Sequence, residues 1–228
     1  MLSFSASSQA GPSGSTPFER QDPPNTRRRR NLSVRQRLRH ATAAIHQTLH
    51  LAPGFVRLVE GRMTQSDYRA LLARLYGFHW PLERGLRAAP PEILGGFDVR
   101  ERERAGALRA DLGVLGLTGA DIDSLPLCER LRPVGSNAEL LGRLYVVEGA
   151  GLGGRVLAAK LDELLADRGA EGRRFFAGRA APDPLPWAAF CGWLEAQGGA
   201  ADIGAVIDSA KTTFRVMAAW LAEDELNG

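Results

Sequence analysis

Residues 33–50 of the chain read SVRQRLRHATAAIHQTLH, and this segment predicts the class of the fold. Its apolar side chains recur at steps of three and four residues, the period of one face of an α-helix. They are Val34, Leu38, Ala41, Ile45 and Leu49. Ser33 and Gln36 fit the capping-box pattern, which satisfies free backbone N–H groups at the start of a helix. The segment therefore predicts an amphipathic helix that begins directly after Ser33.

The helical period continues through most of the remaining chain. A second stripe consists of Tyr68, Leu71, Leu72, Leu75, Phe78 and Leu82. Further helical stretches are predicted over 98–114, 120–131, 137–168, 184–196 and 202–224. Ser136 with Glu139, and more loosely Thr64 with Asp67, mark two more helix starts. No sustained alternation of period two occurs, so we predict a single all-α domain, a helical bundle, over residues 33–228.

The N-terminal segment differs in composition from the rest of the chain. Residues 1–32 are rich in Ser, Gly, Pro, Gln and Asn without a hydrophobic period, which predicts a disordered tail. The tail holds five arginines against Glu19 and Asp22, which accounts for the whole net charge of +3. The body is neutral and lacks the basic field typical of nucleic-acid binding. We interpret the run at 27–30 as a solvated charge run rather than a contact for nucleic acid or an acidic partner.

Length and composition narrow the class further. The chain has 228 residues, 44% of them hydrophobic, which suits one soluble domain with a real core. No stretch approaches the roughly 20 apolar residues of a membrane span, and no signal peptide is evident. Two cysteines, Cys128 and Cys191, are too few for a disulfide framework. We therefore expect a cytoplasmic protein that does not associate with membranes.

The histidines are concentrated on the first predicted helix. The chain has four, and only His79 lies outside residues 40–50. His46 and His50 are one turn apart, a spacing that can chelate a metal, but no H-E-x-x-H pattern or second pair completes a site. We expect structural roles for His40 and His79.

A second unusual segment is GRLYVVEGAGLGGR at residues 142–155. It places five glycines among helix formers, and each interior glycine costs roughly 0.5–1 kcal/mol relative to alanine. The compensation is a kink, close helix packing, or a flat ligand lying against the backbone. The segment lacks the Walker pattern and follows no predicted strand, so a phosphate loop is disfavoured.

Together these segments resemble the heme oxygenase family. LRHATAAIH at 38–46 resembles the proximal helix of that family, and YVVEGAGLGG at 145–154 its distal helix, in particular in the bacterial, bacteriophytochrome-associated branch. The stretches at 72–83 and 210–214 also agree. The resemblance spans about residues 34–222, with the four motifs in the right order.

The resemblance implies a heme held between two helices, with His46 as the axial iron ligand. The distal glycines would let the backbone approach the porphyrin, and a basic residue of the proximal helix would reach a heme propionate. The residues that it places at the heme are Arg39, Thr42, His46, Gly149, Gly153, Gly154 and Phe214. Read from the residues alone, Arg39 is equally an exposed arginine and Phe214 equally a core side chain.

Two positions depart from the family pattern. Many members have an aspartate directly after the first distal glycine, where it orders a water needed for catalysis, and Ala150 stands there instead. His50 occupies a place where a carboxylate is common, one turn after the ligand histidine. The first change bears on proton supply, and the second on how the ring of His46 is oriented.

The function implied is that of a bacterial heme oxygenase with Ala150, Gly149 and Gly153 at the distal side. Such an enzyme uses heme as substrate and cofactor, together with O₂, and forms biliverdin, carbon monoxide and ferrous iron. Its electrons would come from a ferredoxin or a reductase, and a bacteriophytochrome is a candidate acceptor of the product. Two alternatives stay open: a non-catalytic heme carrier or sensor on the same fold, suggested by Ala150, and an all-α interaction protein that recruits partners through its arginine tail.

Overall fold

The segment at 33–50 forms helix α2 (Val34–His50), as its period predicts. The Ser33 Oγ accepts the backbone N–H of Gln36, and the Gln36 side chain accepts the N–H of Ser33. A carboxylate from a distant helix adds to this cap, because Glu195 accepts the N–H groups of Val34 and Arg35 at 2.7 and 2.9 Å. The start of α2 is therefore fixed both locally and by the tertiary fold.

The computed structural model describes residues 32–158, 160–166, 171–178, 185–199 and 201–223. The tail predicted at 1–32 lies outside these residues except for Leu32. The longer helices are α4 (Gln65–Arg87), α6 (Ala105–Val114), α8 (Asn137–Ala158), α11 (Leu185–Gly198) and α12 (Ile203–Ala222). The shorter ones are α3 (Pro53–Val59), α5 (Pro91–Leu94), η1 (Arg100–Arg102), α7 (Gly119–Asp123), α9 (Leu161–Leu164) and α10 (Arg174–Ala177). No strand occurs in this part of the chain, which confirms the all-α prediction.

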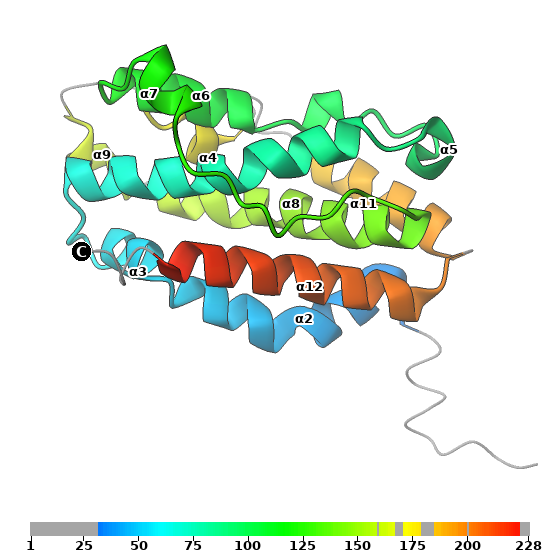
Figure 1. The fold of residues 1–228 in the computed structure, drawn as a ribbon. Coiled ribbons are helices and arrows are strands. Elements are labelled where there is room, and N and C mark those ends of the chain that lie inside the picture. The colour runs from blue at the N-terminus through cyan, green and yellow to red at the C-terminus, as the bar shows by residue number, and fades with distance from the viewer. Residues whose placement is uncertain (1–31, 159, 167–170, 179–184, 200, 224–228) are drawn as a thin grey trace, which may run out of the picture. The chain divides into compact units, whose positions relative to one another are not determined.

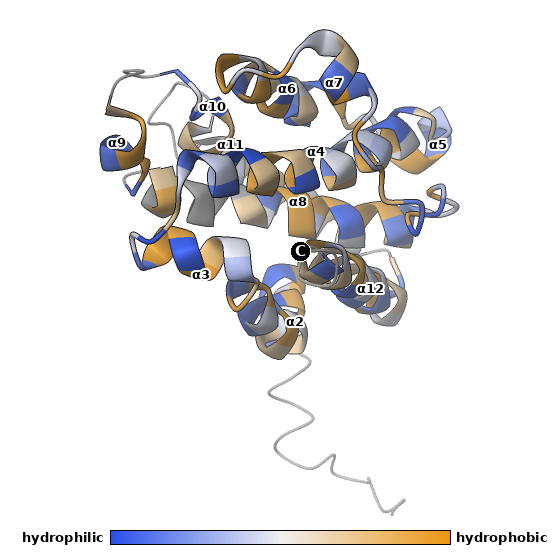
Figure 2. Ribbon diagram, turned by 60° about the vertical axis from the view of Figure 1, so that its left-hand side comes forward, coloured by the Kyte–Doolittle hydropathy of each residue, from blue (hydrophilic) through white to orange (hydrophobic). Residues whose placement is uncertain are grey.

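Five of the longer helices build the frame of the bundle. Helix α12 packs against α8, α2 and α4, and α11 packs against α2 and α8. Helices α2, α8 and α12 run in one direction, and α4 runs in the opposite direction (Figure 1). The apolar faces of the helices turn toward one another in the interior (Figure 2). Over the described ranges, no helix combines the length and the apolar character that a membrane span requires.

Two glycines allow close approach between elements of this frame. A Cβ at Gly142 of α8 would stand 2.6 Å from the backbone oxygen of Val206 and 2.7 Å from the backbone nitrogen of Ala210, both on α12. A Cβ at Gly77 of α4 would stand 2.4 Å from the backbone oxygen of Pro126. Only glycine permits these contacts without a backbone shift.

The prediction of a helix over 120–131 is wrong. Helix α7 ends at Asp123, and the chain crosses α4 as an irregular segment (Figure 1), where the N–H of Cys128 donates to the oxygen of Gly77 at 2.9 Å. Pro126 explains the change, since the residue before a proline avoids the helical region. The helix start at Ser136 follows the prediction in part: Ser136 Oγ accepts the N–H of Glu139, but the Glu139 carboxylate reaches the N–H of Gly135 instead.

Two other predicted helices are interrupted. The stretch 98–114 divides into η1 and α6 because the buried carboxylate of Glu83, on α4, accepts the N–H groups of Arg104 and Ala105 and so fixes the start of α6. The stretch 137–168 divides into α8, which ends at Ala158, and α9.

Candidate functional site

The site begins with the ring of His46 on α2, which is exposed although its helix is packed on α12. The buried ring of Phe214, on α12, lies with its centroid 5.7 Å from that of His46, at an interplanar angle of 83°. An aromatic ring that stands edge-on beside an imidazole restricts the orientations the imidazole can adopt. Phe214 therefore shapes the surroundings of His46 and belongs to the core at the same time.

His50 lies one turn further along α2 and contacts the same ring. The centroids of His46 and His50 are 4.6 Å apart, with the ring planes at 81°. Burial lowers the pKa of His46, and the neighbouring His50 lowers it further. Both effects favour the neutral imidazole, which is the form that binds a metal ion.

A contact between Thr42 and Tyr145 joins α2 to α8. Thr42 is buried, and its hydroxyl donates to the backbone oxygen of Leu38 at 2.8 Å. Burial raises the pKa of Tyr145, while a hydrogen bond with Thr42 and then the positive charge of Arg39 oppose the rise. The three side chains thus lie in one neighbourhood. Thr42 is one turn and Arg39 two turns before His46 on α2, and Tyr145 is one turn before Gly149 on α8.

Gly149 faces open space. A Cβ built there would find no heavy atom within 4 Å. Gly142 is seven residues earlier and hence on the same face of α8, where α12 closes against it. The face that is filled at Gly142 is thus open two turns later at Gly149.

These observations place His46, Gly149 and Phe214 on three helices that run in the same direction (Figure 1). Each lies one or two turns beyond the close contacts of its helix, namely Thr42 with Tyr145 and Gly142 with α12. The sequence motifs predicted these three residues for one site. The structure adds that α12 packs closely against α8 at Gly142, whereas no described residue does so at Gly149.

The other predicted residues lie nearby on the same helices or outside the described set. Arg39 is exposed on α2, and Ala150 is half-buried on α8 directly after Gly149. Gly153 and Gly154 belong to α8, but their surroundings lie outside the described residues. His79 is fully buried in the core as expected, and His40 is exposed.

An ion pair lies directly before Gly149 on α8. Glu148 Oε2 and Arg102 Nη1 are 3.0 Å apart, with side-chain exposures of 13% and 17%. The guanidinium of Arg104 is buried near Glu148 and lies over the ring of Phe175, 4.2 Å from its centroid. Burial lowers the pKa of Arg104, and Glu148 opposes that shift. Glu148 therefore fixes α8 to the segment that precedes α6.

Sequence reasoning did not assign roles to Tyr145 or Arg102. Tyr145 could have been found, because it precedes Gly149 by four residues and thus lies on the same face of the helix. Arg102 carries no such signal, because its partner is 46 residues away and the body contains many arginines.

The arrangement is suited to one kind of ligand. It offers the imidazole of His46, an aromatic side wall formed by Phe214, and at Gly149 a position on α8 that has no side chain. In the part of the chain that the structure describes, no group of three or more His, Cys, Asp or Glu side chains could hold a metal ion. The site thus fits a flat ligand that brings its own metal and takes one ligand atom from the protein.

Comparison with known proteins agrees with this class. The family model for heme oxygenase matches residues 32–223. Curated proteins yield no match. A solved heme oxygenase from Leptospira interrogans superposes with a TM-score of 0.69 at 18% identity, covering 84% of this chain and 100% of that one. Heme oxygenase-1 from the cyanobacterium Synechocystis, solved in complex with heme, gives a TM-score of 0.61 at 17% identity, with coverages of 86% and 94%.

The chain belongs to the heme oxygenase family, since the family model covers most of its length. The solved structures share its fold.

Proposed function

We propose that the protein binds heme at His46 and converts it with O₂ and external electrons to biliverdin, carbon monoxide and ferrous iron. Heme supplies the iron that activates O₂ and is itself the substrate whose macrocycle is opened. The protein contributes binding, orientation and control of water. This agrees with the absence of a paired-carboxylate or nucleophile motif in the sequence.

The residues present fit a heme. His46 offers a neutral imidazole that is exposed on α2. Phe214 provides an apolar ring beside it, and among the described residues no side chain reaches within 4 Å of a Cβ built at Gly149. Arg39 is exposed on the same helix as His46, two turns before it, and its planar guanidinium suits a propionate carboxylate.

Several residues hold these groups in place. Tyr145 of α8 lies close to Thr42 of α2, so the two residues contribute to the contact between these helices. The ring of His50 restricts that of His46 from the C-terminal side of α2. The ion pair of Glu148 with Arg102 fixes α8 directly before the open position. Ala150 carries no group that can move a proton, so we assign proton delivery to water held by backbone carbonyls of α8 around Gly149.

The observation that carries the proposal is the open space at Gly149, on a helix joined to that of His46 by Thr42 and Tyr145. The test is to incubate the purified protein with hemin, O₂, NADPH, ferredoxin and ferredoxin reductase, and to identify the pigment chromatographically. Wild-type protein should form biliverdin. His46→Ala should lose turnover and change the heme spectrum. His40→Ala, an exposed histidine on the same helix, is the matched control and should behave as wild type.

One result would move the ligand to another residue. If His46→Ala kept the wild-type spectrum and rate while His50→Ala lost both, His50 would be the ligand. We assign the electron supply to a ferredoxin or reductase of the cytoplasm, and a bacteriophytochrome that takes biliverdin as its chromophore is the proposed product acceptor.

The alternative is a heme carrier or sensor on the same fold, and Ala150 is the observation that favours it. A carrier would bind hemin with the same dependence on His46 but would leave the porphyrin intact under the reducing conditions above. The pigment analysis therefore separates the two functions.

A further inference from the structure

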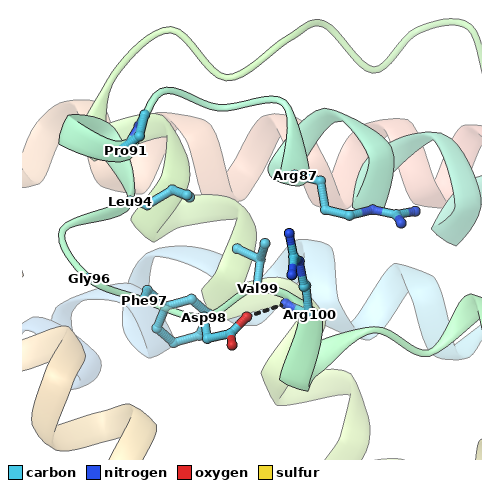
Figure 3. Close-up of a pocket in the computed structure, with 8 residues that line it drawn as sticks. All are labelled: Arg87, Pro91, Leu94, Gly96, Phe97, Asp98, Val99 and Arg100. Atoms are coloured by element: carbon cyan, nitrogen blue, oxygen red, sulfur yellow. Dashed lines mark hydrogen bonds between the residues drawn. The ribbon is translucent and has the colours of Figure 1, made fainter.

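A cavity of about 380 Å³ lies where the end of α4, helix α5 and the segment before η1 meet (Figure 3). Its volume falls within the roughly 300–1,000 Å³ of small-molecule sites. None of its lining residues belongs to α2, α8 or α12, so it is separate from the site around His46. We call it the α5 cavity.

The α5 cavity has an apolar floor. Val99 is buried, and Leu94 and Phe97 are half-buried. The side chain of Leu94 points into the space between α5 and the end of α4 (Figure 3). Phe97 packs against Trp193 of α11, with the ring centroids 4.4 Å apart, and the guanidinium of Arg102 lies 5.5 Å from its centroid on another side. The floor is thus held in place by neighbouring elements, which lowers the entropic cost of filling it.

The rim of the cavity is charged and mainly positive. Arg100 is exposed, and its guanidinium makes no hydrogen bond or ion pair with any residue that the structure describes. Arg87 also lines the cavity and forms an ion pair with Glu103, in which Nε and Oε1 are 3.1 Å apart. Asp98 is the one lining carboxylate, and its Oδ1 accepts the backbone N–H of Arg100 at 2.9 Å. Arg87 extends away from Asp98 (Figure 3), and Asp98 already has a backbone donor, so Arg100 is the lining guanidinium that a ligand can use.

We propose that the α5 cavity binds a small organic monocarboxylate with an aliphatic body. The aliphatic part occupies the floor over Leu94, Phe97 and Val99, and the carboxylate binds the fork of Arg100 at the rim. An arginine fork suits a planar carboxylate because it donates two parallel hydrogen bonds. The site goes beyond the proposed oxygenase activity and does not depend on it.

The proposal is tested on the full-length, heme-free protein by following its ¹H–¹⁵N spectrum during titration with three probes. Hexanoate carries both the charge and the aliphatic body, acetate only the charge, and hexan-1-ol only the body. Hexanoate should shift the amide signals of residues 94–100 with a dissociation constant on the order of millimolar. Acetate and hexan-1-ol should each bind at least about tenfold more weakly, since each lacks one of the two interactions.

Two variants and their matched controls locate the carboxylate. Arg100→Gln and Arg100→Glu should weaken hexanoate binding by about tenfold or more. Arg84→Gln and Arg84→Glu make the same charge changes one turn before Arg87, at an exposed arginine that does not line the cavity, and should leave binding unchanged. Equal binding of hexanoate and hexan-1-ol, or unchanged binding to Arg100→Glu, would overturn the proposal. The assay uses heme-free protein, so its result does not depend on whether the protein turns over heme.

Discussion

Replacing the two glycines at 142 and 149 by alanine should change stability in opposite directions, although both lie on one face of α8. At Gly149 an added methyl group meets no heavy atom within 4 Å. The helix then gains the propensity difference between glycine and alanine, so Gly149→Ala should raise the free energy of unfolding by about 0.4–1 kcal/mol. Part of this gain comes from reduced freedom of the unfolded chain.

At Gly142 the same methyl group would stand 2.6 Å from Ser209 Cβ, 2.6 Å from the oxygen of Val206 and 2.7 Å from the nitrogen of Ala210. Two of these atoms belong to the backbone of α12, so the clash can be relieved only by moving one helix away from the other. Overpacking of this kind costs about 1–3 kcal/mol, which exceeds the gain in helix propensity. Gly142→Ala should therefore destabilise the protein.

The assay is urea unfolding of the heme-free protein followed by far-UV circular dichroism, with hemin titration of the same samples. Leucine at 149 completes the set: Gly149→Leu should stay folded, because its side chain enters open space, but should bind hemin more weakly and lose biliverdin formation. The reasoning is refuted if Gly149→Ala destabilises the protein by more than about 1 kcal/mol, which would indicate tight packing there. It is also refuted if Gly149→Leu keeps wild-type pigment yield.

Three further predictions concern other parts of the chain. Burial lowers the pKa of His79, so below about pH 6.5 the unfolded chain binds a proton at this residue more readily than the folded chain does. The free energy of unfolding should therefore fall by up to about 1.4 kcal/mol for each pH unit by which the pH is lowered. His79→Leu should flatten that slope in urea melts between about pH 6.5 and 5.5, and an unchanged slope would assign it to other groups. Glu148→Ala should lower the free energy of unfolding by about 3 kcal/mol, because the largely buried guanidinium of Arg102 loses this carboxylate. In thermal melts, the double variant with Arg102→Ala should lose less stability than the sum of the two single variants. Deletion of residues 1–31 should leave the melting temperature and hemin affinity nearly unchanged, because their composition offers few apolar groups to bury; a large drop in calorimetry would contradict this.

The sequence predicted those features that depend on residues close together in the chain. The period of α2 and the pairs Ser33 with Gln36 and Thr64 with Asp67 are local, and each forms in the structure. The helix over 120–131 was wrong because the prediction weighed apolar spacing above Pro126, and because the N–H of Cys128 bonds to an oxygen of α4. A hydrogen bond from another helix cannot be read from a local period.

The candidate site shows the same division. The motifs predicted His46, Gly149 and Phe214 as site residues through family resemblance, and the structure places His46 beside Phe214. The motifs left three explanations for the glycines open. The structure distinguishes between two of them residue by residue: Gly142 serves close helix packing, and Gly149 faces open space. The difference depends on the distance to α12, which no pattern within α8 encodes.

The first half of α8 therefore fixes the backbone position of Gly149. Gly142 fits against α12, Tyr145 lies close to Thr42 of α2, and Glu148 pairs with Arg102, so three different neighbours contact the helix within seven residues. At the next residue, Gly149, an added Cβ would meet no heavy atom of the described residues within 4 Å. A position without a side chain can direct a ligand only if its backbone is fixed, because it has no rotamer or hydrogen-bonding group with which to adjust. The placement of Gly149 thus depends on residues of α8 that contact the neighbouring elements.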